Sequence, residues 1–112
     1  MKRIEAVIRP FKLDGVKDRV LRIGVPGMTV SEVQEFDRAV CRRDTYRDST
    51  CKPELVRKLH IQIVADDDLV PPIVEAIVAT ARGGSAGGER IVVSPISDVI
   101  RIRTGETGNE AL

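Results

Sequence analysis

Apolar and charged residues alternate at the start of the chain. Ile4, Ala6 and Ile8 alternate with a second set in which only Val7 is uncharged, and Pro10 ends the pattern; that set is Arg3, Glu5, Val7 and Arg9. A period of two residues is typical of a β-strand that covers a core with one face. Because proline has no N–H to donate, it interrupts strands. The pattern therefore predicts a strand that ends before residue 10.

A helical period follows. Apolar residues recur three or four positions apart, at Leu13, Val16, Val20 and Ile23, and charged residues fill the other face. This spacing predicts an amphipathic helix. Gly24 and Pro26 are typical of a helix C-terminus. Residues 28–36 are rich in Val and Thr and predict a second strand.

The segment 37–54 shows neither period. It has about 18 residues, many of them charged. Structureless loops longer than about 12–15 residues are uncommon inside compact domains, and such loops are usually functional or disordered. Too little chain flanks this segment on either side for two domains. We therefore expect a long loop inside one domain.

The second half repeats the first. Alternation over 58–65 predicts a third strand, and Asp66–Asp68 with Pro71 and Pro72 predicts the start of a helix that ends at Gly83. Residues 91–93 predict a fourth strand, 99–103 a short extended piece, and 104–112 a polar tail. The order predicts an α+β, ferredoxin-like βαββαβ domain over 1–112. Val7, Val33 and Val64 would point to the face without helices, which suggests that partner subunits cover it.

Composition excludes several classes of protein. The 112 residues carry a net charge of +1, only 3% are aromatic and there is no Trp, so we expect no nucleic-acid binding. Apolar runs are too short for a membrane span or a signal peptide, and a cytoplasmic location is expected. Cys41 and Cys51 are interpreted as reduced thiols or as an oxidation switch. With a single histidine, His60, we predict no metal site.

No arrangement of residues predicts catalysis, but an anion site is indicated. The glycine-rich stretch 83–88 is either a flexible connector or a loop whose N–H groups bind phosphate. Arg90 follows it, and Arg101 and Arg103 would project from one face of the short extended piece, about 7 Å apart. Arginines at this spacing could bind adjacent phosphates. Alternatively, they could be solvated side chains that prevent the edge of the sheet from pairing with another strand. Together these residues favour a nucleotide polyphosphate.

Three segments resemble the PII family of nitrogen- and carbon-signalling proteins. They are MKRIEAVIRPFKLD (1–14), GMTV (27–30) and VIRIRTGE (99–106), and the resemblance covers the whole chain. It implies a ferredoxin-like homotrimer that binds adenine nucleotides between subunits and is not an enzyme. Its T-loop would span about 37–55, its phosphate loop about 83–90 and its C-terminal segment 98–112. The T-loop would contact a target protein.

The resemblance also implies the residues of the nucleotide site. The base would lie beside Thr29, Gln62 and Val64. The phosphates would meet the root of the T-loop, the phosphate loop and a neighbouring subunit through Arg38, Gly87, Gly88, Arg90, Arg101 and Arg103. Lys58 matches the family lysine that pairs with the carboxylate of 2-oxoglutarate.

Several positions depart from the family pattern. The family glutamine that helps to hold the magnesium–2-oxoglutarate chelate is Ala39 here, and it is followed by Val40 and Cys41. Glu89 brings an acid close to where phosphates should lie, which would disfavour the most anionic polyphosphates. The tyrosine that many bacterial members uridylylate is replaced by Cys51. Four positions are candidates for modification: Tyr46, Ser49, Cys41 and Cys51.

These departures favour the carboxysome-associated members, which respond to bicarbonate with ADP or AMP. The expected ligands are ADP or AMP, or else ATP, and bicarbonate held at the loop base by residues among Arg38, Ala39, Val40, Cys41 and Lys58. A bicarbonate transporter or another membrane protein would be the target. A nitrogen regulator that senses 2-oxoglutarate is the first alternative. An acylphosphatase-like enzyme would require an asparagine in its active site, and no asparagine precedes Asn109. A metal-tolerance trimer would require more metal ligands than this sequence offers.

Overall fold

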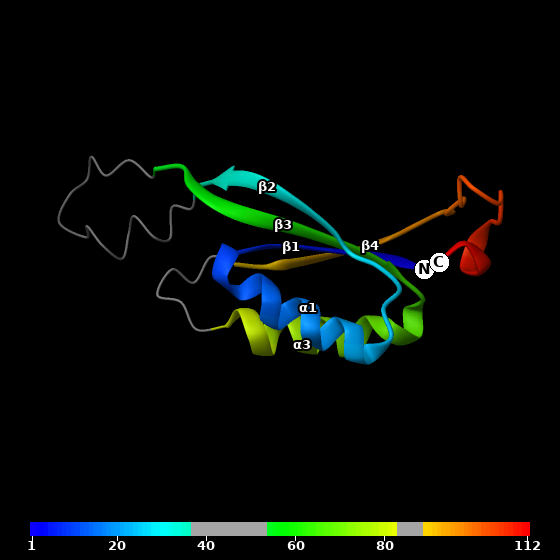
Figure 1. The fold of residues 1–112 in the computed structure, drawn as a ribbon, viewed down its shortest axis with the longest axis horizontal. Coiled ribbons are helices and arrows are strands. Elements are labelled where there is room, and N and C mark those ends of the chain that lie inside the picture. The colour runs from blue at the N-terminus through cyan, green and yellow to red at the C-terminus, as the bar shows by residue number, and fades with distance from the viewer. Residues whose placement is uncertain (37–53, 83–88) are drawn as a thin grey trace.

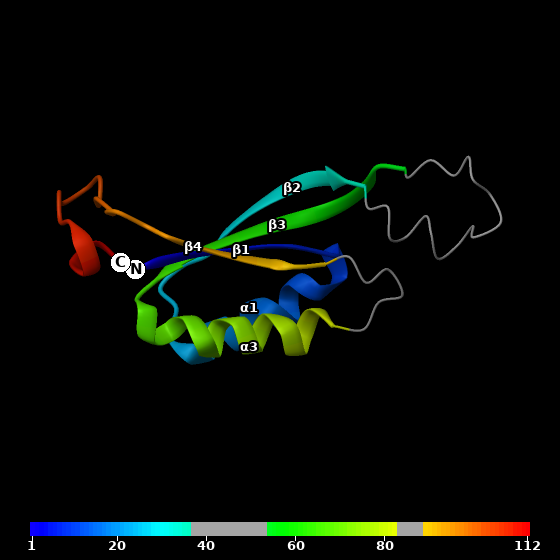
Figure 2. The ribbon, with the colours of Figure 1, turned by 180° about the vertical axis from the view of Figure 1, so that it is seen from behind.

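The computed structural model describes residues 1–36, 54–82 and 89–112. It contains strands β1 (Lys2–Ile8), β2 (Thr29–Glu35), β3 (Val56–Ala65) and β4 (Ile91–Pro95), and helices α1 (Leu13–Ile23) and α3 (Val70–Ala81). Short 3-10 turns lie at Pro10–Lys12, Asp67–Leu69 and Gly108–Ala111. Both helices lie on one side of the sheet, in front and back views alike (Figures 1 and 2). This confirms the predicted α+β, ferredoxin-like order of elements.

The sheet is antiparallel, with strand order β2-β3-β1-β4. The two central strands pair Ile4 with Ile63 and Ala6 with Ile61. Since side chains alternate between the faces of a strand, these residues share the face that the helices cover. Every second residue of each central strand therefore points into the core, and the residues at these positions in the middle of the strands are apolar.

The core is built almost entirely from Ile and Val. Its largest fully buried side chains are Ile4, Ile8, Ile61 and Ile63 from the sheet and Val16, Val20, Ile73 and Ile77 from the helices. Burial of each such side chain contributes roughly 1.5–3 kcal/mol to stability before entropy is counted. Within the described ranges, neither helix is long and apolar enough to cross a membrane.

Both helices begin or end at the predicted signals. Gly24 ends α1 with φ +99°, a left-handed conformation that favours glycine. The side chain of Asp66 accepts a hydrogen bond from the N–H of Asp67 at 2.8 Å, and proline occupies the first turn of α3. Proline is tolerated there because the first N–H groups of a helix have no partner within the helix.

The face of the sheet that lacks helices is called here the open face. Val33 pairs with Lys58, Val7 pairs with His60, and Val64 is even-numbered like these β3 residues. All three valines therefore lie on the open face, as predicted, and each is only half-buried.

The predicted extended piece at 99–103 is wrong. A single bridge joins Ile100 to Thr107, and residues 102–104 form a turn. The N–H of Arg101 donates to the carbonyl of Glu106 at 2.9 Å, and the N–H of Gly105 donates back to Arg101 at 2.8 Å. Gly105 has φ +77°, which lets the chain reverse. Arg101 and Arg103 thus do not share one face of a strand.

The end of the chain is also more ordered than a polar tail. Gly108–Ala111 forms a 3-10 turn, and Ala111 is only 8% exposed. The carboxylate of Asp98 accepts hydrogen bonds from the N–H groups of Val99 at 2.8 Å and Gly108 at 3.0 Å. These local hydrogen bonds compete with strand pairing and explain why the turn replaces the strand.

Asp67 connects the start of β1 to the turn before α3. Its Oδ1 lies 3.0 Å from the amino group of Met1 and 3.4 Å from Nζ of Lys2. The hydrogen bond from the amino group, followed by the one from Lys2, holds the pKa of this carboxyl below its ordinary value. Asp67 is exposed, so the contribution of these pairs to stability is small.

We expect Asp67→Asn to destabilise the protein near neutral pH and to have no effect in acid. A carboxyl whose pKa is lowered by folding stabilises the fold above its ordinary pKa, and this contribution disappears as pH falls through the lowered pKa. Urea unfolding of both proteins across acidic and neutral pH measures the difference. Asp68→Asn, with the same change of charge in the same turn, is the control. A difference between wild type and Asp67→Asn that persists in strong acid would contradict this assignment.

Candidate functional site

The open face collects the residues predicted to contact the base. Thr29 at the start of β2 pairs in register with Gln62 of β3. Val64 lies two residues further along β3 and therefore on the same face. Side chains that are direct neighbours across an antiparallel pair lie about 4.5–5.5 Å apart at their Cβ atoms. The structure thus brings Thr29, Gln62 and Val64 together.

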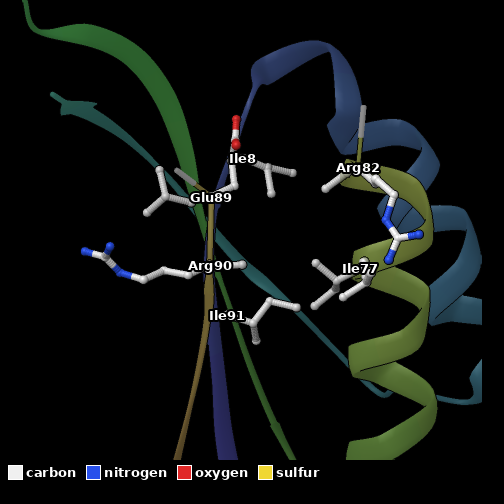
Figure 3. Close-up of a pocket in the computed structure, with 10 residues that line it drawn as sticks. Ile8, Ile77, Arg82, Glu89, Arg90 and Ile91 are labelled. Atoms are coloured by element: carbon white, nitrogen blue, oxygen red, sulfur yellow. The ribbon is translucent and has the colours of Figure 1, made fainter. Parts of the chain in front are cut away.

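Arg90 reaches the same face from the far edge of the sheet. It directly precedes Ile91, which pairs with Ala6 and contacts the core. Figure 3 shows the guanidinium of Arg90 on the opposite side of β4 from Ile77 of α3. Arg90 therefore projects to the open-face side, where its positive charge can meet an anion.

A cavity of about 270 Å³ lies on the other side of β4, against α3. Ile8, Ile77 and Ile91 point into it, and Arg82 and Glu89 lie near its rim (Figure 3). The Oε1 of Glu89 lies 3.6 Å from Nε of Arg9, a partner that sequence reasoning missed. The two residues are 80 positions apart, and only the fold brings them together. Val7 and Arg90, which belong to the open face, also line this cavity.

Lys58, the predicted effector lysine, lies on the open face near the start of β3. Only 7% of the residue is exposed, and within the described ranges it is the only buried charged residue. Its Nζ lies 3.2 Å from Oε1 of Glu35, the last residue of β2. Sequence reasoning placed Lys58 on a strand but missed both its burial and its carboxylate partner. The alternation of β2 was too weak to fix the face of Glu35.

Further ion pairs lie along the middle of the open face. Glu5 of β1 approaches Arg3 at 3.8 Å and Nε2 of His60 at 3.5 Å, and the second contact is an ion pair only when His60 is protonated. In the parts of the chain that the structure describes, no group of three His, Cys, Asp or Glu residues could hold a metal ion. The face therefore offers nitrogen donors for an anion, and Arg3, Lys58 and His60 among them already have carboxylate neighbours.

Arg101 and Arg103 lie apart from Arg90. The segment after β4 begins where the N–H of Ile96 donates to the carbonyl of Met1, at the opposite end of β4 from Arg90 (Figure 1). Nη2 of Arg101 donates to main-chain oxygens of Ala111 at 3.3 Å and Leu112 at 2.8 Å. Arg103 is exposed. One chain does not bring these arginines together, and their contribution from a neighbouring subunit stays a prediction.

The remaining predicted site residues lie outside the described residues. They are Arg38, Ala39, Val40, Cys41, Tyr46, Ser49, Cys51, Gly87 and Gly88.

Comparison with known proteins identifies the family of the chain. A family model described as "Nitrogen regulatory protein P-II" matches residues 1–106. The chain is 48% identical to the nitrogen regulatory protein P-II of Nostoc punctiforme and 46% identical to that of Synechocystis. It is 41% identical to nitrogen regulatory protein P-II 1 of Escherichia coli, and all three matches span the full length of both chains. The chain belongs to the P-II family of regulatory proteins.

Proposed function

We propose that this P-II protein is a homotrimeric regulator that binds an adenine nucleotide between subunits and a small anion near Lys58. The nucleotide is ADP or AMP in preference to ATP, and the anion is bicarbonate. Ligand binding is signalled through the segment 37–55 to a target protein in inorganic-carbon metabolism. The observation that carries this proposal is that Thr29, Gln62 and Val64 lie together on a face that no helix covers, and that Arg90 projects to the same face from the opposite edge of the sheet.

Assembly is supported by the apolar residues of the open face. Val7, Val33 and Val64 are only half-buried, and Val92 on the same face is 49% exposed. Apolar residues that line one side of a sheet favour burial against another surface. Two or more copies of the chain would cover them and form a cleft in which residues of one chain meet Arg101 and Arg103 of another.

The choice of nucleotide follows from charge. Arg90 supplies positive charge, while Glu89 beside it brings a carboxylate that Arg9 only partly neutralises at 3.6 Å. Each further phosphate adds negative charge and therefore adds repulsion from Glu89. This repulsion reduces the advantage that ATP would otherwise have over ADP and AMP.

The choice of effector follows from the ligands at the loop base. Ala39 has no oxygen that could hold magnesium, and Mg²⁺ requires near-ideal octahedral coordination. A 2-oxoglutarate chelate would therefore lack a ligand. Bicarbonate needs no chelate and can be held by two or three donors, among them Nζ of Lys58.

A nitrogen regulator that senses ATP, ADP and 2-oxoglutarate is the second candidate. The printed names of the relatives, at 41–48% identity, favour it. The lysine that would meet the 2-oxoglutarate carboxylate is also present, as Lys58. Binding of 2-oxoglutarate separates the two candidates.

We expect a trimer in solution at micromolar concentration, because the open face needs a partner surface. Light scattering should give about three times the 12.3 kDa of the chain. Val7→Asp should weaken the assembly, since it places a carboxylate on that face, whereas Asp14→Asn on the exposed side of α1 should not. A mass of a single chain for the wild type would refute the trimer and remove the cleft between subunits.

We expect ADP or AMP to bind at least as tightly as ATP in titration calorimetry. Arg103→Ala should weaken nucleotide binding by about 2 kcal/mol or more, which is typical when one partner of a buried charge pair is truncated. Arg22→Ala, on the helix layer, is the control and should bind as the wild type does. A tenfold or greater preference for ATP would contradict the effect assigned to Glu89.

We expect no binding of 2-oxoglutarate with Mg-ATP at millimolar concentration, because a lost magnesium ligand should cost more than the 1.4 kcal/mol that changes affinity tenfold. Bicarbonate should tighten nucleotide binding, and Lys58→Ala or Arg38→Ala should abolish this response. Lys17→Ala on α1 is the control for loss of a positive charge. Micromolar binding of 2-oxoglutarate would instead establish the nitrogen regulator.

A further inference from the structure

Lys58 and Glu35 form an ion pair across the two strands that flank residues 36–55. Val33 pairs with Lys58 and Glu35 pairs with Val56, so Lys58 and Glu35 are diagonal neighbours on the open face. Nζ and Oε1 are 3.2 Å apart, within hydrogen-bond distance. Lysine is almost never fully buried unless it is paired. Glu35 is the carboxylate that neutralises this buried cation.

The two partners differ in exposure. The side chain of Lys58 is 9% exposed, whereas that of Glu35 is 33% exposed. The ammonium is therefore largely shielded from solvent, whereas part of the side chain of Glu35 remains accessible to it. The more exposed partner is the one that can be displaced without unpacking the sheet.

The carboxylate of Glu5 on this face is already paired with Arg3 and His60. Glu89, at the rim of the cavity on the other side of β4, is paired with Arg9. Within residues 1–36, 54–82 and 89–112, Glu35 is thus the one acid paired with Lys58. If Glu35 moves away, the buried ammonium has no other carboxylate partner there. Such an uncompensated buried charge is strongly destabilising, so an external anion that takes the place of Glu35 would relieve this cost.

We propose that Glu35 is an internal competitor that occupies the anion position of Lys58 and sets which anions this site accepts. A carboxylate and bicarbonate present the same planar O–C–O group with a delocalised negative charge, so Glu35 imitates the ligand chemically. An external anion binds by displacing Glu35, and a dicarboxylate suffers more repulsion from it than bicarbonate does. The inference rests on the proposed function for the site at Lys58 and adds the residue that controls its selectivity.

The test compares anion binding in variants of Glu35. Glu35→Gln keeps the shape and a hydrogen-bond acceptor but removes the charge, and Glu35→Asp keeps the charge but shortens its reach. Glu32→Gln, which removes the same charge from an exposed position on the other face of β2, is the matched control. Each protein is titrated with bicarbonate and with malonate, a dicarboxylate that needs no metal chelate, at fixed ADP. Thermal unfolding verifies that each variant folds.

We expect Glu35→Gln to lower the half-saturating concentration of malonate at least tenfold and that of bicarbonate by less. Glu35→Asp should give a smaller gain, and Glu32→Gln should match the wild type. Addition of Lys58→Met to Glu35→Gln should abolish the gain, because the anion would then lack its cation. A gain that survives Lys58→Met would reflect net charge alone and would overturn the proposal.

Failure of this inference and failure of the proposed effector give different results. If bicarbonate acts through Lys58 in the wild type but Glu35→Gln and Glu35→Asp bind anions unchanged, the competitor is wrong and the effector stands. If the wild type ignores bicarbonate but Glu35→Gln binds malonate through Lys58, the competitor stands and the effector is wrong. If neither the wild type nor any variant binds bicarbonate or malonate, both the proposed effector and the competitor are wrong.

Discussion

Two helices can cover only one face of a four-stranded sheet, and the rest of this structure depends on that limit. On the covered face, alternate residues of β1 and β3 supply the isoleucines of the core, including Ile4 and Ile63. The same alternation places charged residues of both central strands, among them Glu5 and Lys58, on the open face. The residues that stabilise the fold and those that can meet a ligand therefore belong to the same two strands but to opposite faces.

The open face balances its charges within the chain. Glu5 lies between Arg3 and His60, and Glu35 holds Lys58, at 3.2–3.8 Å. Pairs on an exposed face are worth little, since water screens them. A second chain that covers the face would exclude water and lower the dielectric constant there. The electrostatic interactions of every charge on the face would then become stronger. Pairing within one chain keeps the cost of that burial low, and it means that an anionic ligand at Lys58 meets a cation that already has a partner.

The sequence predicted the fold well because its periods are local. The alternation at 4–8, the helical spacing at 13–23 and the prolines at the start of α3 each depend on residues a few positions apart. Residues 99–103 were predicted incorrectly because their alternation resembles a strand, while hydrogen bonds to Asp98 and the left-handed Gly105 make a turn more favourable. Local pattern does not reveal which of two such competing structures wins.

The candidate site could be predicted only in part, for the same reason. Thr29, Gln62, Val64 and Lys58 were placed on strands, and strand alternation then determined their face. The partners of Lys58 and Arg9 depend on strand register and on contacts between residues up to 80 positions apart, which no local pattern contains. The residues that adjust the charge of the site, Glu35 and Glu89, were therefore the ones whose contacts the sequence did not reveal.

Strand register connects the core to this charge balance. Val30 pairs with Ile61 on the covered face, and the same register places Glu35 beside Lys58 on the open face. A slip of one residue would turn every side chain of β2 to the opposite face. It would bring Glu32 and Gln34 onto the open face and remove Glu35 from Lys58. Within β2 only Val33 and Glu35 are half-buried, and both lie on the open face, so the contacts of these two side chains with β3 are what the slip would lose.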